Sequence, residues 1–374
     1  MFKDIKYIRV KDKGYVGVLM ILLISLGLFG FLLISNTLNF KNNFFSRFFP
    51  TPTVIAADIP PNTWNVPVKL PFPVNYPGAE DMPYISPGGN EMYFVYNPCS
   101  DMSIFENCSD TVYFPRPNDG GTRTYEIYST TKVGGSWLEP DYLDPPINNA
   151  VLGASSGSVR LSSDGSTMYF MQIAAGSLSQ DIWVSHKKVD QTWDVPYNLS
   201  QHFLPLSFNS TGEDAPTITS DGKTLYFYVM DSSKIYVSTR DDPNCDSCWS
   251  QAQILPAPVN DPDLTISDIH TYISPNGNRL YFISNRLVNP YNCPGDTERR
   301  PALFVSTKNP DSSWTQPEML NIPYPNPCNT NDFLVAVGGP TLTSDENTLI
   351  FVGARGIYGQ PPSLDLYMVT RITI

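Results

Sequence analysis

Short runs of alternating apolar and polar residues recur five times along the chain, separated by turns rich in Ser, Pro, Asp, Gly and Asn. Each period contains a polar turn followed by a Tyr-Phe type strand: SPGGNEMYF from Ser86, SSDGSTMYF from Ser162, TSDGKTLYF from Thr219, SPNGNRLYF from Ser274 and TSDENTLIF from Thr343. The alternation predicts β-strands, and the polar turns predict where they end. Self-similarity with a period of roughly 60 residues indicates a repeat architecture rather than a single wound domain.

Two further elements belong to each period. A second strand-like run follows the first: YEIYST from Tyr125, DIWVSH from Asp181, KIYVST from Lys234, ALFVST from Ala302 and DLYMVT from Asp365. The outer strands carry Trp64, Trp137, Trp193, Trp249 and Trp314, followed by Asn75, Asn148, Asn209, Asn260 and Asn326. Four strands per period form one small antiparallel meander. Because a lone meander cannot bury both faces, a radial arrangement of such sheets, a β-propeller, is predicted.

The two ends of the repeat region complement each other. The last period stops after the strand Asp365–Thr370 and therefore lacks an outer strand. The segment Trp64–Leu70 reads as an outer strand with no blade before it. We therefore expect an all-β, five-bladed β-propeller over residues 61–374, closed by an N-terminal strand.

These repeats resemble the TolB-type, WD-like β-propeller repeat family over roughly residues 61–374. The resemblance is carried by the Ser-Pro or Ser-Asp turn with Gly before Tyr-Phe, by the strand that ends in Ser-Thr, and by Trp-x-x-Pro with a following Pro-x-Asn. It implies the propeller fold and leaves the function open, because members of such a fold class serve different roles.

The charge composition of the chain bears on whether it binds nucleic acid. The chain has 374 residues, a net charge of −12 and only 24 basic residues, with no Lys/Arg cluster in the repeat region. Phosphate binding needs clustered cations, so nucleic acid is not expected as a partner.

The N-terminal region predicts a membrane segment. Residues 1–14 form a basic tail, residues 15–35 are apolar and long enough to span a bilayer, and residues 36–60 form a linker. The basic tail places the N-terminus in the cytoplasm and the ring outside it, at the cell surface or in the periplasm. A cleaved signal peptide is the alternative, with Ile55-Ala56-Ala57 as the candidate cleavage site. The sequence favours an uncleaved single-pass anchor.

Six cysteines fit an exported ring, since disulfides form outside the cytoplasm. Local pairs are the simplest expectation: Cys99 with Cys108, Cys293 with Cys328, and Cys245 with Cys248. The last pair forms C-x-x-C, which in other settings binds zinc or carries redox chemistry; here a small loop disulfide is favoured.

Candidate catalytic residues were sought where the innermost strands begin, because these strands surround the central channel. Aligning the five repeats puts Asp81, Gly157, Asp214, Ile269 and Gly338 in register, and Asp268 misses the register by one position. Paired carboxylates at one mouth are the groups that glycoside cleavage requires.

This set, Asp81, Asp214 and Asp268, resembles the three carboxylates of the five-bladed arabinanase-type glycosidases. The sequence departs from that arrangement at Gly157, where an acid would be needed. The other interpretation is structural: Asp-Met-Pro from Asp81 and Asp-Ala-Pro from Asp214 are turns in which the carboxylate accepts backbone N–H bonds. The structural interpretation is favoured.

Three more residues are binding candidates at the channel mouth. Arg160 is the one arginine on an innermost strand, His270 lies next to Asp268, and Tyr272 follows two positions later. The sialidase pattern, three such arginines with S-x-D-x-G-x-x-W turns, is not met. No nucleophile elbow and no metal-ligand spacing occurs, so no cofactor and no metal is expected.

Two function classes follow. The first is a membrane-tethered extracytoplasmic module that binds or scaffolds a protein or an envelope glycan, with residues 98–122 and 288–300 as presenting loops. The second is an extracytoplasmic glycoside hydrolase of the arabinanase-like type. The sequence favours the binding module over an enzyme.

Overall fold

A computed structural model of the chain divides into two units, residues 1–58 and 59–374. The structure describes residues 63–97, 125–148, 155–174, 177, 179–200, 212–357 and 362–372, all in the second unit. The predicted tail, membrane segment and linker lie outside these residues. Within the described part, no helix is long and apolar enough to cross a membrane.

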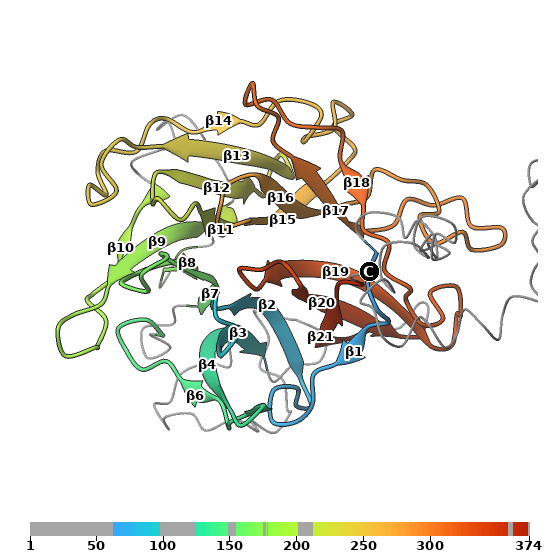
Figure 1. The fold of residues 1–374 in the computed structure, drawn as a ribbon, viewed down its shortest axis with the longest axis horizontal. Coiled ribbons are helices and arrows are strands. Elements are labelled where there is room, and N and C mark those ends of the chain that lie inside the picture. The colour runs from blue at the N-terminus through green and yellow to red at the C-terminus, as the bar shows by residue number, and fades with distance from the viewer. Residues whose placement is uncertain are drawn as a thin grey trace, which may run out of the picture. The chain divides into compact units, whose positions relative to one another are not determined.

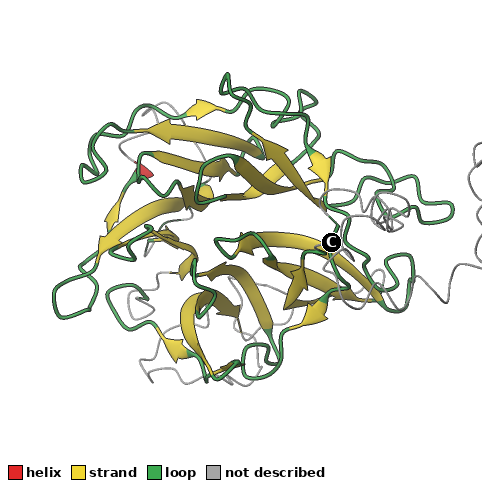
Figure 2. Ribbon diagram, viewed as in Figure 1, coloured by secondary structure: helices red, strands yellow, loops and turns green. Residues whose placement is uncertain are grey.

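Five antiparallel sheets are arranged around a common axis (Figure 1), and Figure 2 shows strands and loops with almost no helix. Blade 1 contains β2 (Ala79–Ile85), β3 (Glu91–Asn97), β4 (Glu126–Val133), β5 (Ser136–Trp137) and β6 (Asp141–Tyr142). Blade 2 contains β7 (Ser155–Leu161), β8 (Thr167–Ile173), β9 (Gln180–His186) and β10 (Tyr197–Asn198).

The remaining blades repeat the same order from the axis outward. Blade 3 contains β11 (Glu213–Ile218), β12 (Thr224–Val229), β13 (Lys234–Thr239) and β14 (Gln253–Ile254). Blade 4 contains β15 (Asp268–Ile273), β16 (Arg279–Ser284), β17 (Ala302–Thr307) and β18 (Glu318–Met319). Blade 5 contains β19 (Phe333–Leu342), β20 (Thr348–Gly356), β21 (Ser363–Thr370) and, from the other end of the sequence, β1 (Val68–Lys69). The prediction of an all-β five-bladed propeller is confirmed.

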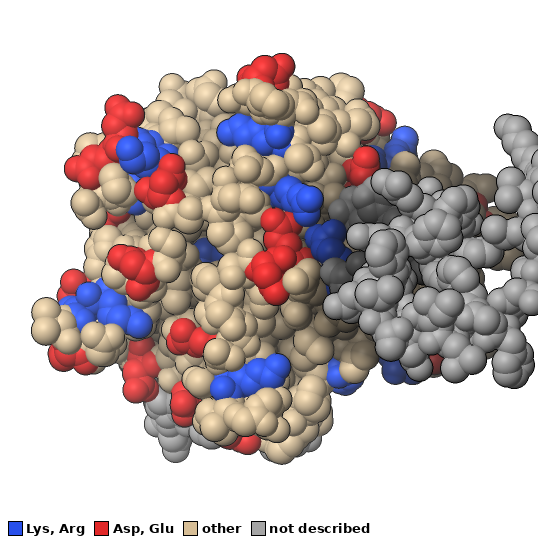
Figure 3. Space-filling view, in the orientation of Figure 1, with Lys and Arg blue, Asp and Glu red and all other residues tan. Residues whose placement is uncertain are grey.

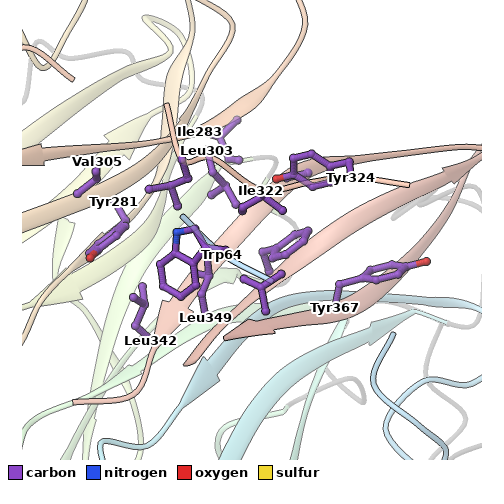
Figure 4. Close-up of a cluster of buried hydrophobic side chains, with 14 of the residues drawn as sticks. Trp64, Tyr281, Ile283, Leu303, Val305, Ile322, Tyr324, Leu342, Leu349 and Tyr367 are labelled. Carbon is purple, nitrogen blue, oxygen red and sulfur yellow. The ribbon is translucent and has the colours of Figure 1, made fainter. Parts of the chain in front are cut away.

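Closure by the N-terminal strand is also confirmed. β1 pairs antiparallel with β21, with Val68 opposite Met368. Backbone bonds continue the contact on both sides: Asn65 N–H donates to Thr370 O at 2.9 Å, and Leu70 N–H donates to Leu366 O at 2.9 Å. Trp64 is fully buried between blades 4 and 5, among side chains that Figure 4 labels, such as Ile322, Leu342 and Leu349. The first described strand therefore supplies the outer edge of the last blade.

The second strand of each blade is buried on both faces, because neighbouring blades cover it from either side. In β8, for example, only the first of seven residues is partly exposed. Both alternating side-chain sets are consequently apolar or aromatic, as in Met-Tyr-Phe-Met. The Tyr-Phe signature of the repeat thus reflects packing between blades.

The spacing from Trp to Asn that recurs along the chain has a structural cause in three blades. The side-chain amides of Asn75, Asn148 and Asn260 each accept from and donate to the backbone of the third strand of their blade. In blade 2 the hydroxyl of Ser200 accepts the equivalent N–H, from Ile182, at 2.9 Å. Asn209 lies outside the described residues, and Asn326 makes no such bond among them.

Candidate functional site

Each innermost strand begins with the same irregularity. The register between the two inner strands shifts directly after Asp81, Gly157, Asp214, Ile269 and Gly338, and blade 5 has a second shift between Ala336 and Gly338. The next residue has a positive φ in every blade: Met82, Ser158, Ala215, His270 and Gly339. The alignment made from the sequence therefore corresponds to one structural position repeated around the axis.

Asp81 and Asp214 stabilise this unusual backbone. Asp81 Oδ1 accepts a hydrogen bond of 2.7 Å from the N–H of Met82, and Asp214 Oδ1 accepts one of 2.6 Å from the N–H of Ala215. The hydroxyl of Tyr228 donates to the other oxygen of Asp214 at 3.3 Å. Both carboxylates thus accept the backbone bonds that the structural interpretation expected.

The environment of Asp81 nevertheless disfavours its charge. The pKa of Asp81 is raised to about 7, because loss of hydration and, to a smaller extent, the carboxylate of Asp214 outweigh the opposing hydrogen bond from the Met82 N–H. A carboxyl group with this pKa exchanges a proton near neutral pH, which is a property of many general acids.

His270 lies against the same part of the channel. A Cβ atom added at Gly338 would lie 2.7 Å from His270 Nδ1 and 3.9 Å from Asp81 Oδ1, so both groups approach the glycine of blade 5. The ring of His270 meets Tyr228 edge-on at 5.4 Å. Loss of hydration lowers the pKa of His270, which favours the neutral imidazole.

Arg160 and Tyr272 lie deeper along the axis. The guanidinium of Arg160 sits between two aromatic rings, 5.5 Å from the centroid of Tyr84 and 5.6 Å from that of Tyr272. Its nitrogens donate to the carbonyls of Pro83, Val159 and Pro340 at 2.8–3.1 Å. The side chain therefore links the inner strands of blades 1, 2 and 5.

Direct hydrogen bonds also join neighbouring inner strands. The N–H of Ile85 donates to Thr341 Oγ1 and that of Ile273 to Thr217 Oγ1, both at 3.1 Å. The hydroxyl of Thr271 donates to Ala215 O at 3.0 Å. Met82 and Ala215, from blades 1 and 3, belong to one buried cluster. Among the described residues the axis is filled by side chains over much of its length.

Asp268 does not join Asp81 and Asp214. It is fully buried and forms ion pairs with Lys234 at 3.2 Å and Arg286 at 2.5 Å. Its oxygens also accept from Ser284 Oγ and the N–H of Asp261. A shift of one residue along a strand turns the side chain to the other face, so Asp268 points away from the mouth, toward blade 3.

Disulfides join Cys245 to Cys248 and Cys293 to Cys328, as predicted. Cys99 and Cys108 lie outside the described residues. Across the described ranges, no group of three or more His, Cys, Asp or Glu side chains could hold a metal ion.

One pairing that was not predicted from the sequence repeats in all five blades. A basic side chain lies over the outer-strand indole: Lys132 over Trp137, Lys187 over Trp193, Arg240 over Trp249, Lys308 over Trp314 and Arg371 over Trp64, at 4.3–5.7 Å. A signal was present, because in blades 2 to 5 the cation comes one position after the end of the third strand, and in blade 1 Lys132 lies near the end of β4.

Charges on the surface are mixed. Figure 3 shows small groups of Lys and Arg interleaved with Asp and Glu on the face it presents. Nucleic-acid binding needs a continuous basic surface, and none is visible on that face.

Together these features define a five-bladed β-propeller with two carboxylates and a histidine near one end of its axis. No family model matches the sequence, and no curated protein matches it. Similar solved structures include an alpha-L-arabinofuranosidase from Podospora anserina, with 12% identity, a TM-score of 0.48 and coverage of 83% of this chain and 96% of that chain.

Two further solved structures are similar to this chain. The catalytic domain of an alpha-L-arabinofuranosidase from Coprinopsis cinerea has 10% identity and a TM-score of 0.46, covering 82% of this chain and 96% of that one. TolB from Acinetobacter baumannii has 12% identity and a TM-score of 0.36, covering 75% of this chain and 53% of that one. At these values the likeness concerns the fold alone, and the TolB-type repeat family stays an expectation.

Proposed function

We propose that this chain is a membrane-tethered, extracytoplasmic module that binds or scaffolds a protein or an envelope glycan. The observation that carries the proposal is the engagement of the candidate carboxylates by the fold. Asp81 and Asp214 accept backbone N–H bonds, and Asp268 is neutralised by two cations. Carboxylates held in this way support the ring itself, and recognition then falls to surface loops.

The loop from Val288 to Arg300 has the rigidity that a presenting loop needs. The Cys293–Cys328 disulfide ties it to the next loop of blade 4. Asn289 bonds the backbone of Cys293 through both its amide oxygen and its amide nitrogen. A cavity of about 320 Å³ between the two loops is lined by residues that include Arg300 and Phe333. A preorganised loop loses less entropy on binding, which favours affinity.

The extracytoplasmic location is supported by cysteine chemistry. Two disulfides lie in surface loops, and the described residues contain no free cysteine. Such bonds persist in oxidising compartments. We place the anchor at residues 15–35, as the hydropathy of the sequence predicts.

A glycoside hydrolase acting through Asp81 and Asp214 is the second candidate. It is favoured by one observation, the pKa of Asp81 of about 7 beside the second carboxylate, Asp214. In this alternative Asp81 is the general acid and Asp214 the partner carboxylate, and neutral His270 contributes a polar contact near Gly338.

One experiment separates the candidates. The full chain would be screened for binding to proteins and to arabinan-type and envelope glycans, and the same glycans would be assayed for hydrolysis. Binding without turnover supports the module. Turnover that is lost in Asp81→Asn but kept in the exposed control Asp332→Asn, with folding intact in both, supports the hydrolase. If the chain shows neither binding nor turnover, the result contradicts both candidates.

A further inference from the structure

Arg160 is a buried cation without a carboxylate partner. Its exposed fraction is 4%, and it forms no ion pair with any described residue. The other deeply buried basic side chains are paired: Lys234 and Arg286 with Asp268, and Arg240 with Asp246. Among these buried basic side chains of the described residues, Arg160 is therefore the one without a carboxylate partner.

The polar contacts of Arg160 satisfy hydrogen bonds without neutralising the charge. Three carbonyl oxygens and the faces of Tyr84 and Tyr272 surround the guanidinium, and its buried Nε–H has no acceptor. Asp214 acts on it from beyond ion-pair distance, and loss of hydration lowers the pKa of Arg160 to about 10. An uncompensated buried charge is strongly destabilising, so a counter-charge is expected close by.

A cavity of about 50 Å³ adjoins Arg160 on the axis. Its walls include Arg160, Tyr84 and Thr217 from three blades. The Tyr84 hydroxyl donates to no described acceptor, and the Thr217 hydroxyl, which accepts from Ile273 N–H, likewise keeps its own hydrogen free. The lining therefore holds a cation, several hydroxyl groups that include those of Tyr84 and Thr217, and no acid.

The size and position of the cavity limit which ligands it can bind. One water molecule needs about 10–15 Å³ of such a cavity, so the space admits a few particles of that size and no sugar or nucleotide. The outer end is formed by Pro87, Ser163 and Ser220, which are exposed turn residues. Small solutes can therefore reach the guanidinium from the face that carries these turns.

We propose that this axial cavity binds one small monovalent anion of the chloride type, which supplies the counter-charge to Arg160. The guanidinium provides the charge, and the hydroxyls of Tyr84 and Thr217 provide two donors. The bound ion stabilises the junction of the inner strands that Arg160 links.

The test is thermal unfolding of the full chain in chloride, compared with gluconate at the same ionic strength. Gluconate is too large for the cavity, so chloride alone should raise the unfolding midpoint, by about 2 °C or more, and the rise should saturate as binding does. Arg160→Met should abolish the chloride-specific rise. The exposed control Arg355→Met should keep it.

An equal rise in both salts, or a chloride-specific rise that survives in Arg160→Met, overturns the proposal. If Arg160→Met fails to fold, crystals of the native chain soaked in bromide give a separate answer. An anomalous peak beside Arg160 supports the site, and an ordered cavity that holds only water contradicts it.

Discussion

The guanidinium of Arg371 lies 4.6 Å from the ring centroid of Trp64, so the two ends of the propeller meet in one cation–π pair. Arg371 also donates through Nε to the carbonyl of Glu346, at the turn before β20. Similar pairs lie within the other four blades, but this one joins residues from opposite ends of the ring. The ring is thus closed by the same kind of cation–π pair that occurs within each of the other blades.

Removing the indole should open this junction. We expect Trp64→Ala to lower the free energy of unfolding by about 3–5 kcal/mol, because a fully buried aromatic is lost from the contact between blades 4 and 5. The control Val68→Ala changes a side chain in the same segment that is 60% exposed, and should stay within about 0.5 kcal/mol. Urea denaturation measures both. Equal effects would argue against closure by this segment.

Asp268 should prove structural. Asp268→Ala leaves Lys234 and Arg286 buried without their carboxylate, and we expect it to cost about 3–5 kcal/mol. Asp332→Ala breaks the exposed pair with Arg355 and should cost less than about 1 kcal/mol. Chemical denaturation compares the two. A fully stable Asp268→Ala that had lost an activity would reverse this assignment.

Asp81 is expected to destabilise the fold when charged. Its pKa is raised to about 7 in the folded state, so the folded protein binds more protons than the unfolded one between the two pKa values, and stability falls as pH rises through that window. Asp81→Asn keeps an oxygen that can accept the Met82 N–H and removes the charge. We expect the variant to be more stable than the native chain at about pH 8, by about 1 kcal/mol or more, and about equal to it near pH 4.

The pH series also bears on function. A charge on Asp81 that costs stability at neutral pH would count in favour of the glycoside hydrolase alternative, whereas the hydrogen bond that its side chain accepts from the Met82 N–H supports the turn in either case. If Asp81→Asn is instead less stable at every pH, the carboxylate serves the turn, and the glycosidase alternative loses the observation that favours it.

His186 should give a pH dependence of its own. Its Nε2 lies 2.6 Å from Asp246 Oδ2, and that hydrogen bond raises the pKa of His186. A raised pKa contributes stability that is fully present below the unfolded value of about 6.5 and is lost as pH rises through the folded value. The stability difference between the native chain and His186→Gln should therefore be larger near pH 6 than near pH 9. Asp246→Asn should abolish this difference; a difference that does not change with pH would contradict the assignment.

The sequence was informative wherever the repeat itself carries the signal. The five bulge positions could be aligned from the sequence because the bulge of each inner strand lies at the same spacing from the polar turn that follows it. Asp268 shows that an offset of one residue is enough to make such a prediction wrong. Its neighbour Ile269 occupies the aligned position, whereas Asp268 forms a buried ion pair with Lys234.

Other features depend on residues far apart in the sequence. Arg160 lies between Tyr84 and Tyr272, which are brought to it only by ring closure. Gly338 meets His270 across the junction of blades 4 and 5. No local pattern encodes such meetings. The cation over each Trp was encoded locally, near the end of each third strand, and could have been found by extending the repeat by one or two positions.

The antiparallel pairing of β1 with β21 also constrains the order of events during synthesis. The amide of Asn75 bonds Leu366, 291 positions further along the chain, so the segment translated early cannot dock until the last blade has emerged. Until then its apolar side chains need some other protection from water, and the last blade has an open edge. A newly made chain should therefore stay vulnerable to proteases and to pairing with other chains until the last blade has been made, and become resistant in a single late step.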